Sequence, residues 1–574
     1  MKKKFLKCLL ITLASLALFS NEYNLNKTFD VDSKIYKNLC TLFIAQKKAL
    51  PSSTGPWSAQ ELKNMLDLID YENLEGIYKK VYDSILAEIF TERLINQKSF
   101  SMHFSAQADI QFYAHTNTNF NRESDWNYGF EERSPLFLGS AEFWSKNYFY
   151  ALHTLSLGTP SGIQNDKDYD NFYCINFTHN IPCLPPNSAM AFNLDVNPRS
   201  LLCFGGENWS FRVGRDKIKW GSGETGNLFL GGNSVYDDNF CFVMFFDKFK
   251  FTNLITFYPS EYDGITSSNS LNGIKSFIAH KFETRLFDQR LELSIAEAIM
   301  FQSVKNTFDV RIYNPMNFFH NYFIRNNANS ILGVDANFAI TQNLNVYAQI
   351  VMDDFTIFGE TSPSNGKGGC PNAFGYMLGL KSVIPVENGF FNICVEGVYN
   401  DTYLYLRESY DSKNEIYGVS FYRYVREYDM INGSRINYYK VCTGYRYGGD
   451  CVVADLKLKY QGFHGNSCDM IWNIGCEFFY FAHGIVYTDN QWGFYPEGIY
   501  SPVSPSTVSP VGINPSSGAV QHTLRFSIFG DYEILKDFVV YATMDSYFIK
   551  NMRNKANKAW DFDFQFIFGI KYKI

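Results

Sequence analysis

Two groups of aromatic and basic side chains are the residues of this sequence best suited to binding chemistry. The first lies within 406–449 and comprises Tyr422, Arg423, Tyr424, Arg426 and Tyr428; the second lies within 550–560 and comprises Lys550, Arg553, Lys555, Lys558 and Trp560. Aromatic faces stack on sugar rings, and guanidinium groups clamp carboxylates or phosphates. These residues predict polysaccharide contacts. The alternative, which stays open, is an aromatic girdle with rim cations that contact lipopolysaccharide.

A glycine-rich segment satisfies the pattern of a dinucleotide-binding loop. Gly221, Gly223 and Gly226 fit G-x-G-x-x-G after a predicted strand, and Asp247 follows 21 residues later. The following residues, 227–233, cannot begin a stable helix, although a helix N-terminus is what holds the pyrophosphate. Asp247 is also expected on a tight hairpin turn. We therefore predict no nucleotide cofactor, and the lysine of a phosphate-binding loop is absent as well.

The sequence contains no recognisable catalytic constellation. No serine lies in G-x-S-x-G, since Ser234 has neighbours of the wrong type. Two adjacent carboxylate pairs occur, Asp237/Asp238 and Asp353/Asp354. Because adjacent residues of a strand point to opposite faces, neither pair can act jointly on one substrate. We read them as turn or rim residues and predict no catalytic residue and no enzyme.

The cysteines indicate neither a metal centre nor a defined disulfide framework. Twelve cysteines occur, without a C-x-x-C pair. Three pairs, Cys174/Cys183, Cys442/Cys451 and Cys468/Cys476, have the spacing of local disulfides, but the connectivity stays open. His464 and Cys468 could contribute to a zinc site, although unrelated loop residues are the better interpretation. We predict no metal.

Composition excludes several classes of protein. The chain has 574 residues, of which 18% are aromatic and only 19% charged, so it is not intrinsically disordered. Its mean hydropathy is −0.20, and after residue 20 no apolar run approaches the length of a spanning helix. Residues 1–20 have a basic start and a short apolar run, as a signal peptide does. Their removal leaves 47 basic and 58 acidic residues, a balance unfavourable to nucleic-acid binding.

Helical periodicity is confined to the region that follows the signal peptide. Ser58 and Glu61 form a capping box ahead of a helix with Leu62, Met65, Leu66 and Ile69 on one face. A second amphipathic stretch runs through Leu74, Ile77, Val81, Ile85 and Ile89. We predict a small helical bundle within 21–98.

From Phe100 onward the hydrophobic period is two. Over 561–574, aromatic or aliphatic residues alternate with mostly polar ones up to the last residue. Such a terminus is typical of outer-membrane β-barrels, which leave no unpaired backbone edge in lipid. The pattern predicts 18 strands, at 100–115, 134–144, 146–158, 172–182, 208–219, 239–246, 249–258, 276–286, 290–301, 331–340, 344–356, 374–385, 390–405, 450–461, 469–483, 520–533, 538–549 and 561–574.

The predicted strands place short turns at one end of the barrel and long loops at the other. The connection 183–207 is the exception, because this partition makes it a long periplasmic loop. The segments 406–449, 484–519 and 550–560 become extracellular loops, and the Pro-rich composition of 484–519 agrees with a loop.

Several motifs together resemble the capsule-assembly Wzi family of outer-membrane proteins. They run in order along residues 50–460: Leu50-Pro-Ser-Ser-Thr-Gly-Pro-Trp57, Phe211-Arg-Val-Gly-Arg215, Trp220-Gly-Ser-Gly223, Gly226-Asn-Leu-Phe-Leu230, Tyr313-Asn-Pro-Met-Asn-Phe-Phe-His320, Ile331-Leu-Gly-Val-Asp335, Val346-Tyr-Ala-Gln-Ile-Val-Met-Asp-Asp354, Glu396-Gly-Val-Tyr399 and Gly444-Tyr-Arg-Tyr-Gly-Gly-Asp450. The resemblance implies an eighteen-stranded barrel with a periplasmic helical bundle, and a surface lectin that holds capsular polysaccharide. It also leads us to expect a glycine-rich loop in the lumen, formed by Trp220, Gly221, Gly223 and Gly226.

We therefore predict an all-β transmembrane barrel in the outer membrane of a Gram-negative-type, didermic bacterium. Its expected parts are a signal peptide (1–20), a periplasmic helical region (21–98) and the barrel (99–574). The predicted function is anchoring of surface or capsular polysaccharide, with a porin-type diffusion channel or a surface adhesin as alternatives. A helical bundle or an inward-folded loop 302–330 would close such a channel. Expected partners are outer-membrane lipid, lipopolysaccharide-type glycolipid, the polysaccharide and the barrel-assembly machinery, with no nucleic acid and no cofactor.

Overall fold

The structure is a computed structural model of the whole chain. It describes residues 25–90, 95–97, 100–117, 134–145, 148–157, 176–179, 199–233, 236–258, 274–303, 310–314, 327–353, 373–407, 418–429, 435–463, 470–486, 493–495, 498–500, 519–535, 537–557 and 559–574. Every structural statement below refers to these residues.

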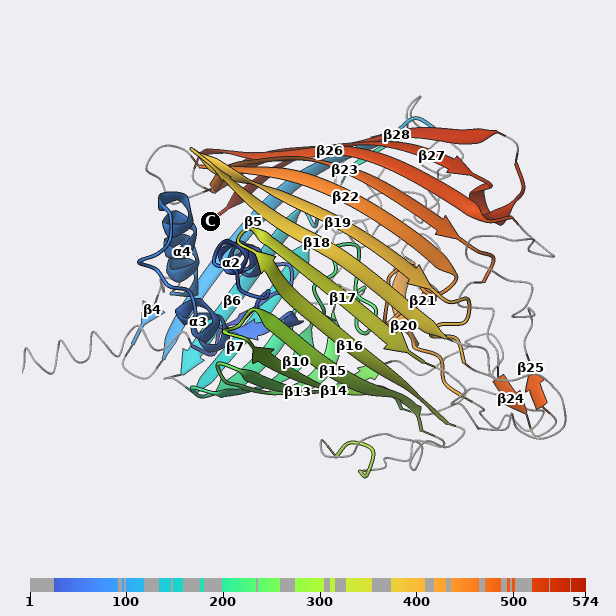
Figure 1. The fold of residues 1–574 in the computed structure, drawn as a ribbon, viewed down its shortest axis with the longest axis horizontal. Coiled ribbons are helices and arrows are strands. Elements are labelled where there is room, and N and C mark those ends of the chain that lie inside the picture. The colour runs from blue at the N-terminus through green and yellow to red at the C-terminus, as the bar shows by residue number, and fades with distance from the viewer. Residues whose placement is uncertain are drawn as a thin grey trace, which may run out of the picture.

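Eighteen antiparallel strands close into a barrel, as the alternating pattern predicts (Figure 1). The sheet closes where the C-terminal strand β28 pairs with β5. In order around the wall, the strands are β5 (Ser101–His115), β6 (Phe137–Ser145), β7 (Phe149–Leu157), β9 (Ser200–Gly205), β10 (Trp209–Asp216), β12 (Asp237–Phe245), β13 (Phe249–Tyr258), β14 (Lys275–Leu286), β15 (Leu291–Gln302), β16 (Ala328–Thr341), β17 (Leu344–Met352), β18 (Phe374–Val386), β19 (Gly389–Asn400), β22 (Cys451–Phe463), β23 (Met470–His483), β26 (Gln521–Leu535), β27 (Phe538–Lys550) and β28 (Trp560–Lys573).

One predicted wall strand was wrong. Of the segment 172–182 the structure describes 176–179, the short strand β8 (Asn176–His179), which pairs with β5, while β9 fills the wall position between β7 and β10. Because residues 200–205 of the expected connection 183–207 are a wall strand, this connection is not the long periplasmic loop expected, and β9 and β10 are joined by a turn at 206–208. The alternation failed here because β9 is apolar on both faces. Its inward residues Leu201 and Cys203 pack against Trp144 and Tyr150.

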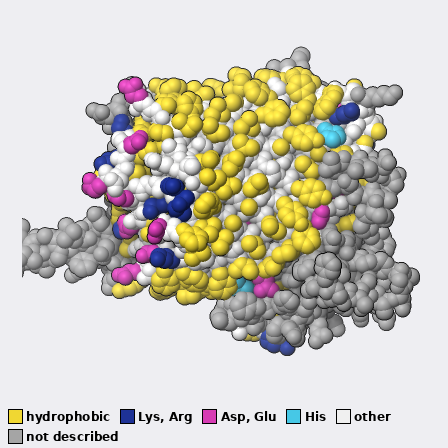
Figure 2. Space-filling view, viewed as in Figure 1, with side chains coloured by type: hydrophobic (Ala, Val, Ile, Leu, Met, Phe, Trp, Pro, Cys, Tyr) yellow, Lys and Arg dark blue, Asp and Glu magenta, His cyan; other side chains and the backbone are white. Residues whose placement is uncertain are grey.

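The outward face of the wall is apolar and the inward face is largely polar. On β28 the outward Phe562 is 45% exposed, whereas the inward Asp563 is completely buried. Large apolar side chains on most wall strands are exposed in the same way, and on the face seen in Figure 2 they form a broad apolar area across the wall. Such a surface is what an outer-membrane barrel presents to lipid.

Three helices lie at the end of the barrel where the short turns are (Figure 1). They are α2 (Lys34–Ala45), α3 (Ala59–Asp67) and α4 (Gly76–Ile89). The Ser58 hydroxyl accepts a hydrogen bond from the Glu61 amide and caps α3, as predicted, and Leu62 and Leu66 are buried. The Glu61 carboxylate does not return to the cap, since it pairs with Lys250 of the wall. In bacterial outer-membrane barrels the short-turn end faces the periplasm.

No helix in the described part of the chain is long and apolar enough to cross a membrane.

Two further sequence expectations are corrected by the described residues. The loop 302–330 does not fold inward at 310–314, because Ile312 and Tyr313 pack on Ile278 and Ile299, which lie on the outward parity of β14 and β15. Cys442 and Cys451 are free thiols and form no local disulfide. Cys476 is free as well, and Cys174, Cys183, Cys468 and His464 lie outside the described residues.

Candidate functional site

The glycine-rich segment 217–233 leaves the wall after β10 and enters the lumen. Its strand β11 (Lys219–Trp220) pairs with β2 (Thr54–Gly55) of the N-terminal segment. The buried Trp220 ring stacks on Phe229 at a centroid distance of 6.0 Å. Gly221 and Gly226 have φ angles of 133° and 147°, which favour glycine, and a Cβ on Gly221 would lie 2.2 Å from an oxygen of Asn227. The glycines thus permit a tight path through the lumen.

Glu396 of β19 binds the middle of this segment. Its carboxylate accepts hydrogen bonds from the backbone amides of Glu224 (2.7 Å) and Thr225 (2.9 Å) and from the Thr225 hydroxyl (2.5 Å). The Tyr347 hydroxyl of β17 donates to the same carboxylate at 2.5 Å. A buried carboxylate with several donors is well satisfied, so Glu396 fixes the segment to the wall.

The side chain of Glu224 extends the contact to two wall lysines. Its oxygens lie 3.1 Å from the ammonium of Lys457 on β22 and 3.7 Å from that of Lys381 on β18. Lys457, followed by Lys381, holds the pKa of the Glu224 carboxyl well below its ordinary value, although burial opposes them. Lys381 also donates to the Ser222 carbonyl at 2.8 Å.

A second attachment lies on β17. Gln349 accepts from the Leu228 amide at 3.0 Å and donates to the Asn227 side-chain oxygen at 2.8 Å. Asn227 accepts in turn from the Gly223 amide at 2.9 Å. The segment therefore spans the lumen from β10 and β12 to β17, β19 and β22.

Residues from the long-loop end fill the space on the other side of this segment. The Tyr405 hydroxyl donates to the Leu228 carbonyl at 2.5 Å, and the Tyr445 hydroxyl shares a 2.7 Å hydrogen bond with Thr225. The Tyr405 amide donates to Asp353 at 2.9 Å. Asp353 thus orders an inward-folded loop, whereas Asp354 lies outside the described residues. Tyr405 and Tyr445 are buried, so this part of the lumen is filled.

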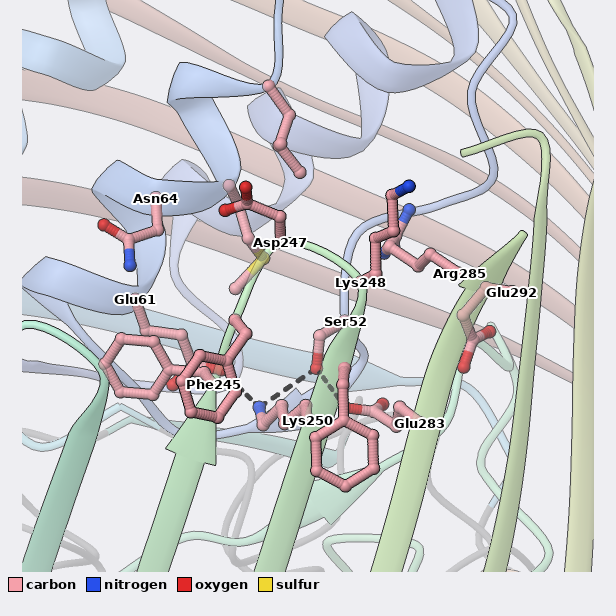
Figure 3. Close-up of a pocket in the computed structure, with 14 residues that line it drawn as sticks. Ser52, Glu61, Asn64, Phe245, Asp247, Lys248, Lys250, Glu283, Arg285 and Glu292 are labelled. Carbon is pink, nitrogen blue, oxygen red and sulfur yellow. Dashed lines mark hydrogen bonds and ion pairs between the residues drawn. The ribbon is translucent and has the colours of Figure 1, made fainter. Parts of the chain in front are cut away.

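The N-terminal segment 49–58 closes the lumen at the helix end. Lys250 of β13 donates to the Ser52 hydroxyl (3.0 Å) and pairs with Glu61 (Figure 3). It also donates to the Thr54 carbonyl at 2.8 Å. Ser52 and Thr54 each donate to Glu283 of β14 at 2.7 Å. Burial raises the pKa of Glu61, although Lys250 opposes it. A cavity lies beside these residues (Figure 3). Its central polar groups already bind one another, so they hold the N-terminal segment to the wall.

Two of the predicted polysaccharide-binding residues of the first group, Tyr422 and Arg423, lie inside the barrel. Arg423 is buried and pairs with Asp237 of β12 at 2.6 Å, and the buried Tyr422 ring accepts a cation–π contact from Lys275 of β14. Both residues belong to β20 (Tyr422–Asp429), which forms a hairpin with β21 (Arg435–Cys442) inside the predicted loop 406–449. Tyr424 and Arg426 are on the same strand, but their side chains lie outside the described residues.

The second group lies at the long-loop end, between β27 and β28. Lys555 is exposed, Lys550 and Arg553 are partly buried, and Lys558 lies outside the described residues. Trp560 is 46% exposed and shares the outward face of β28 with Phe562. The strands β12–β14 that hold the first group are nearly half a turn around the barrel from β27 and β28. The structure therefore does not bring the two groups together in one site.

Comparison with known proteins identifies the fold. No protein-family model matches the chain, and no curated protein matches it. Among solved structures, Wzi of Escherichia coli, an outer-membrane protein involved in group 1 capsule assembly and described as a carbohydrate-binding β-barrel, aligns with 95% of this chain and 98% of its own. The TM-score is 0.55 at 13% sequence identity. The chain has the Wzi fold. At this identity the likeness concerns the fold, and it agrees with the resemblance seen in the motifs.

Two outer-membrane proteins with lower TM-scores also align with the chain. OprD of Pseudomonas aeruginosa aligns with 84% of the chain at 8% identity, with a TM-score of 0.38. DcaP of Acinetobacter baumannii aligns with 84% at 6% identity, with a TM-score of 0.36. The Wzi fold, the closed wall and the apolar outward face make the protein an outer-membrane β-barrel.

Sequence reasoning missed most of the residues that organise the lumen. Glu396 and Tyr445 occur in motifs that carried the family resemblance, yet nothing in their local pattern assigned them a partner. Lys457 and Lys459 alternate with apolar residues along β22, and this alternation marks them as inward-facing. Polar residues on the inward parity of each strand are the signal that could have found them.

Proposed function

We propose that this protein is a non-enzymatic outer-membrane barrel that binds surface or capsular polysaccharide at its long-loop end. The observation that carries the proposal is the filled lumen. The segments 49–58 and 217–233 and the loop residues around Tyr405 and Tyr445 occupy it in succession and are tied to the wall by buried hydrogen bonds. A barrel so closed is suited to holding a ligand at its surface rather than to passing one through.

The Wzi fold supports the same proposal, because Wzi itself is a carbohydrate-binding barrel. The exposed cation Lys555 and the exposed ring of Trp560 supply suitable chemistry at the long-loop end. An indole stacks on the apolar face of a sugar, and cations attract the carboxylates or phosphates of an anionic chain. Anionic surface polysaccharide is therefore the ligand class that we propose.

Two measurements on detergent-purified protein test the proposal. Glycan-array binding should detect an acidic polysaccharide, and planar-bilayer recordings should show no steady conductance. A porin-type channel would give the opposite pair of results. An adhesin would bind host ligands and no bacterial glycan.

A pair of tryptophan variants separates binding from a role in the membrane girdle. Trp560→Ala combined with Lys555→Ala should weaken glycan binding by about tenfold, as expected for the loss of one stacking and one charged contact. Trp472→Ala is the matched control, because Trp472 is an outward residue, 37% exposed, near the short-turn end of β23. Equal loss of binding in both variants would mean that the rings serve the girdle, and the proposed contact would be wrong.

A further inference from the structure

Three lysines near the helix end of the lumen have no partner for their ammonium groups in the described part of the chain. They are Lys37 on α2, Lys219 on β11 and Lys459 on β22. Lys37 is exposed, and the other two are half-buried inside the barrel. By contrast, the nearby Lys217 ammonium lies 2.7 Å from Asp32.

The three lysines converge on the surroundings of Glu224. Lys459 follows Lys457 on the inward face of β22, and Lys457 contacts Glu224. Helix α2, which carries Lys37, packs against β17 and β18. The pKa of Glu224 is lowered by Lys37 and Lys219 in addition to its two bound lysines, which also places them nearby. In Figure 2, Lys and Arg side chains gather in one patch where Figure 1 shows α2.

Positive charge exceeds negative charge in this space. Five lysines, Lys37, Lys219, Lys381, Lys457 and Lys459, lie around the carboxylate of Glu224. The carboxylate of Glu396 is also close, but it is occupied by the Glu224 and Thr225 amides and by two hydroxyl groups. Glu477 is 3.5 Å from Lys457 but is also held by Arg525 at 2.6 Å. Asp531 accepts a hydrogen bond from Asn473 at 2.8 Å. Burial lowers the pKa of the Lys219 ammonium, with smaller contributions from Lys381 and Lys217, although Asp32 and Glu224 oppose it.

We propose that this luminal lysine cluster binds an anionic ligand that carries phosphate or carboxylate groups. Unpaired ammonium groups on three different elements can contact one anion from several sides, and low-dielectric walls strengthen their combined field. The segment 217–233 closes the space toward the long-loop end, whereas Lys37 is exposed at the helix end. The ligand therefore enters from the helix end, opposite to the proposed polysaccharide site, and the inference does not depend on that site.

The test uses full-length protein in detergent and two probes, inorganic pyrophosphate and trigalacturonate, in calorimetric titrations at low ionic strength. We expect saturable binding of at least one probe. Pyrophosphate alone would identify a phosphate ligand, and trigalacturonate alone a carboxylate ligand. The affinity of the variant Lys37→Ala/Lys459→Ala for the probe should fall by at least about tenfold, because each lost ammonium removes a charged contact.

The control is Lys63→Ala on α3, because Lys63 pairs with Asp67 at 2.6 Å away from the lumen. In the described part of the chain, neither the Lys37 nor the Lys459 side chain bonds to another element, so thermal unfolding should stay unchanged in the double variant and exclude misfolding. Absence of saturable binding to the wild-type protein, equal affinity in the double variant, or equal loss in Lys63→Ala would overturn the proposal. The glycan array separates this result from the proposed function, since polysaccharide binding should survive in the double variant.

Discussion

Glu396 on the wall and Thr225 in the glycine-rich segment make two hydrogen bonds with each other, one through the Thr225 amide at 2.9 Å and one through its hydroxyl at 2.5 Å. Their separation of 171 residues in the chain makes this pair a long-range connection between strand β19 and the segment that follows β10. The pair lies at the middle of the filled lumen, and several expected properties of the protein depend on it.

Replacing Glu396 should loosen the segment that crosses the lumen. Glu396→Ala leaves the Glu224 and Thr225 amides without their acceptor, at a cost of about 1–3 kcal/mol in the free energy of unfolding. The variant should also show channel openings in planar bilayers that the wild-type protein lacks. Glu387→Ala is the control, since Glu387 is exposed in the turn of the same hairpin. A stable, electrically silent Glu396→Ala would contradict the role of this carboxylate.

Acid should weaken the same region through Glu224. Lys457 and Lys381 depress the folded-state pKa of Glu224 below the ordinary 4.5. A depressed acid pKa stabilises the fold at pH values above the unfolded value, and this contribution is lost as the pH falls through the folded value. Unfolding midpoints measured from pH 7 down to pH 3 should therefore fall less for Glu224→Gln than for the wild-type protein. Parallel pH profiles for the two proteins would show that Glu224 is not stabilised by the lysines.

The barrel could be predicted from the sequence because each strand carries its own signal. On β28 the outward phenylalanines and the inward Asp563 and Gln565 alternate without any need for long-range information. The prediction failed at β9, where Leu201 and Cys203 are apolar because they face Trp144 and Tyr150 inside the barrel. A strand that is apolar on both faces has no period of two.

The arrangement of the binding residues could not be predicted, because it depends on partners far along the chain. Arg423 reads as a loop residue, yet its carboxylate partner Asp237 precedes it by almost two hundred residues and belongs to another strand. The same applies to Glu396 and to Lys250, whose partners lie in the glycine-rich and N-terminal segments. The local sequence predicts whether such a side chain points into or out of the barrel. Its interaction partner is known only from the closed barrel.

The loop that precedes β22 should respond to pH in the opposite sense to Glu224. Burial raises the pKa of Asp450 from 3.8 to about 6, although the Val486 amide and the Thr402 hydroxyl donate hydrogen bonds to it. A raised acid pKa means that the folded state binds the proton more tightly, so this contribution to stability falls as the pH rises from about 4 to 6. The unfolding midpoint of Asp450→Asn at pH 8 should therefore equal or exceed that of the wild-type protein. The difference between the two midpoints should shrink below pH 4. A midpoint far below that of the wild-type protein at pH 8 would show that the charged form is the stabilising one.

The depth of the lipid-facing band can be measured on one strand. Phe566 is near the middle of β28 and Phe562 near its long-loop end, and both side chains point outward. A lysine costs about 2–4 kcal/mol at the bilayer midplane and about 0–1 kcal/mol near the interface, because its ammonium must reach water. In lipid vesicles, Phe566→Lys should therefore lower the free energy of unfolding by more than Phe562→Lys does. Both variants remove one phenylalanine from the same face, so the difference between them reports depth alone. An equal loss in the free energy of unfolding for the two variants would mean that both positions have equal access to water. A bilayer midplane near the middle of β28 would then be excluded.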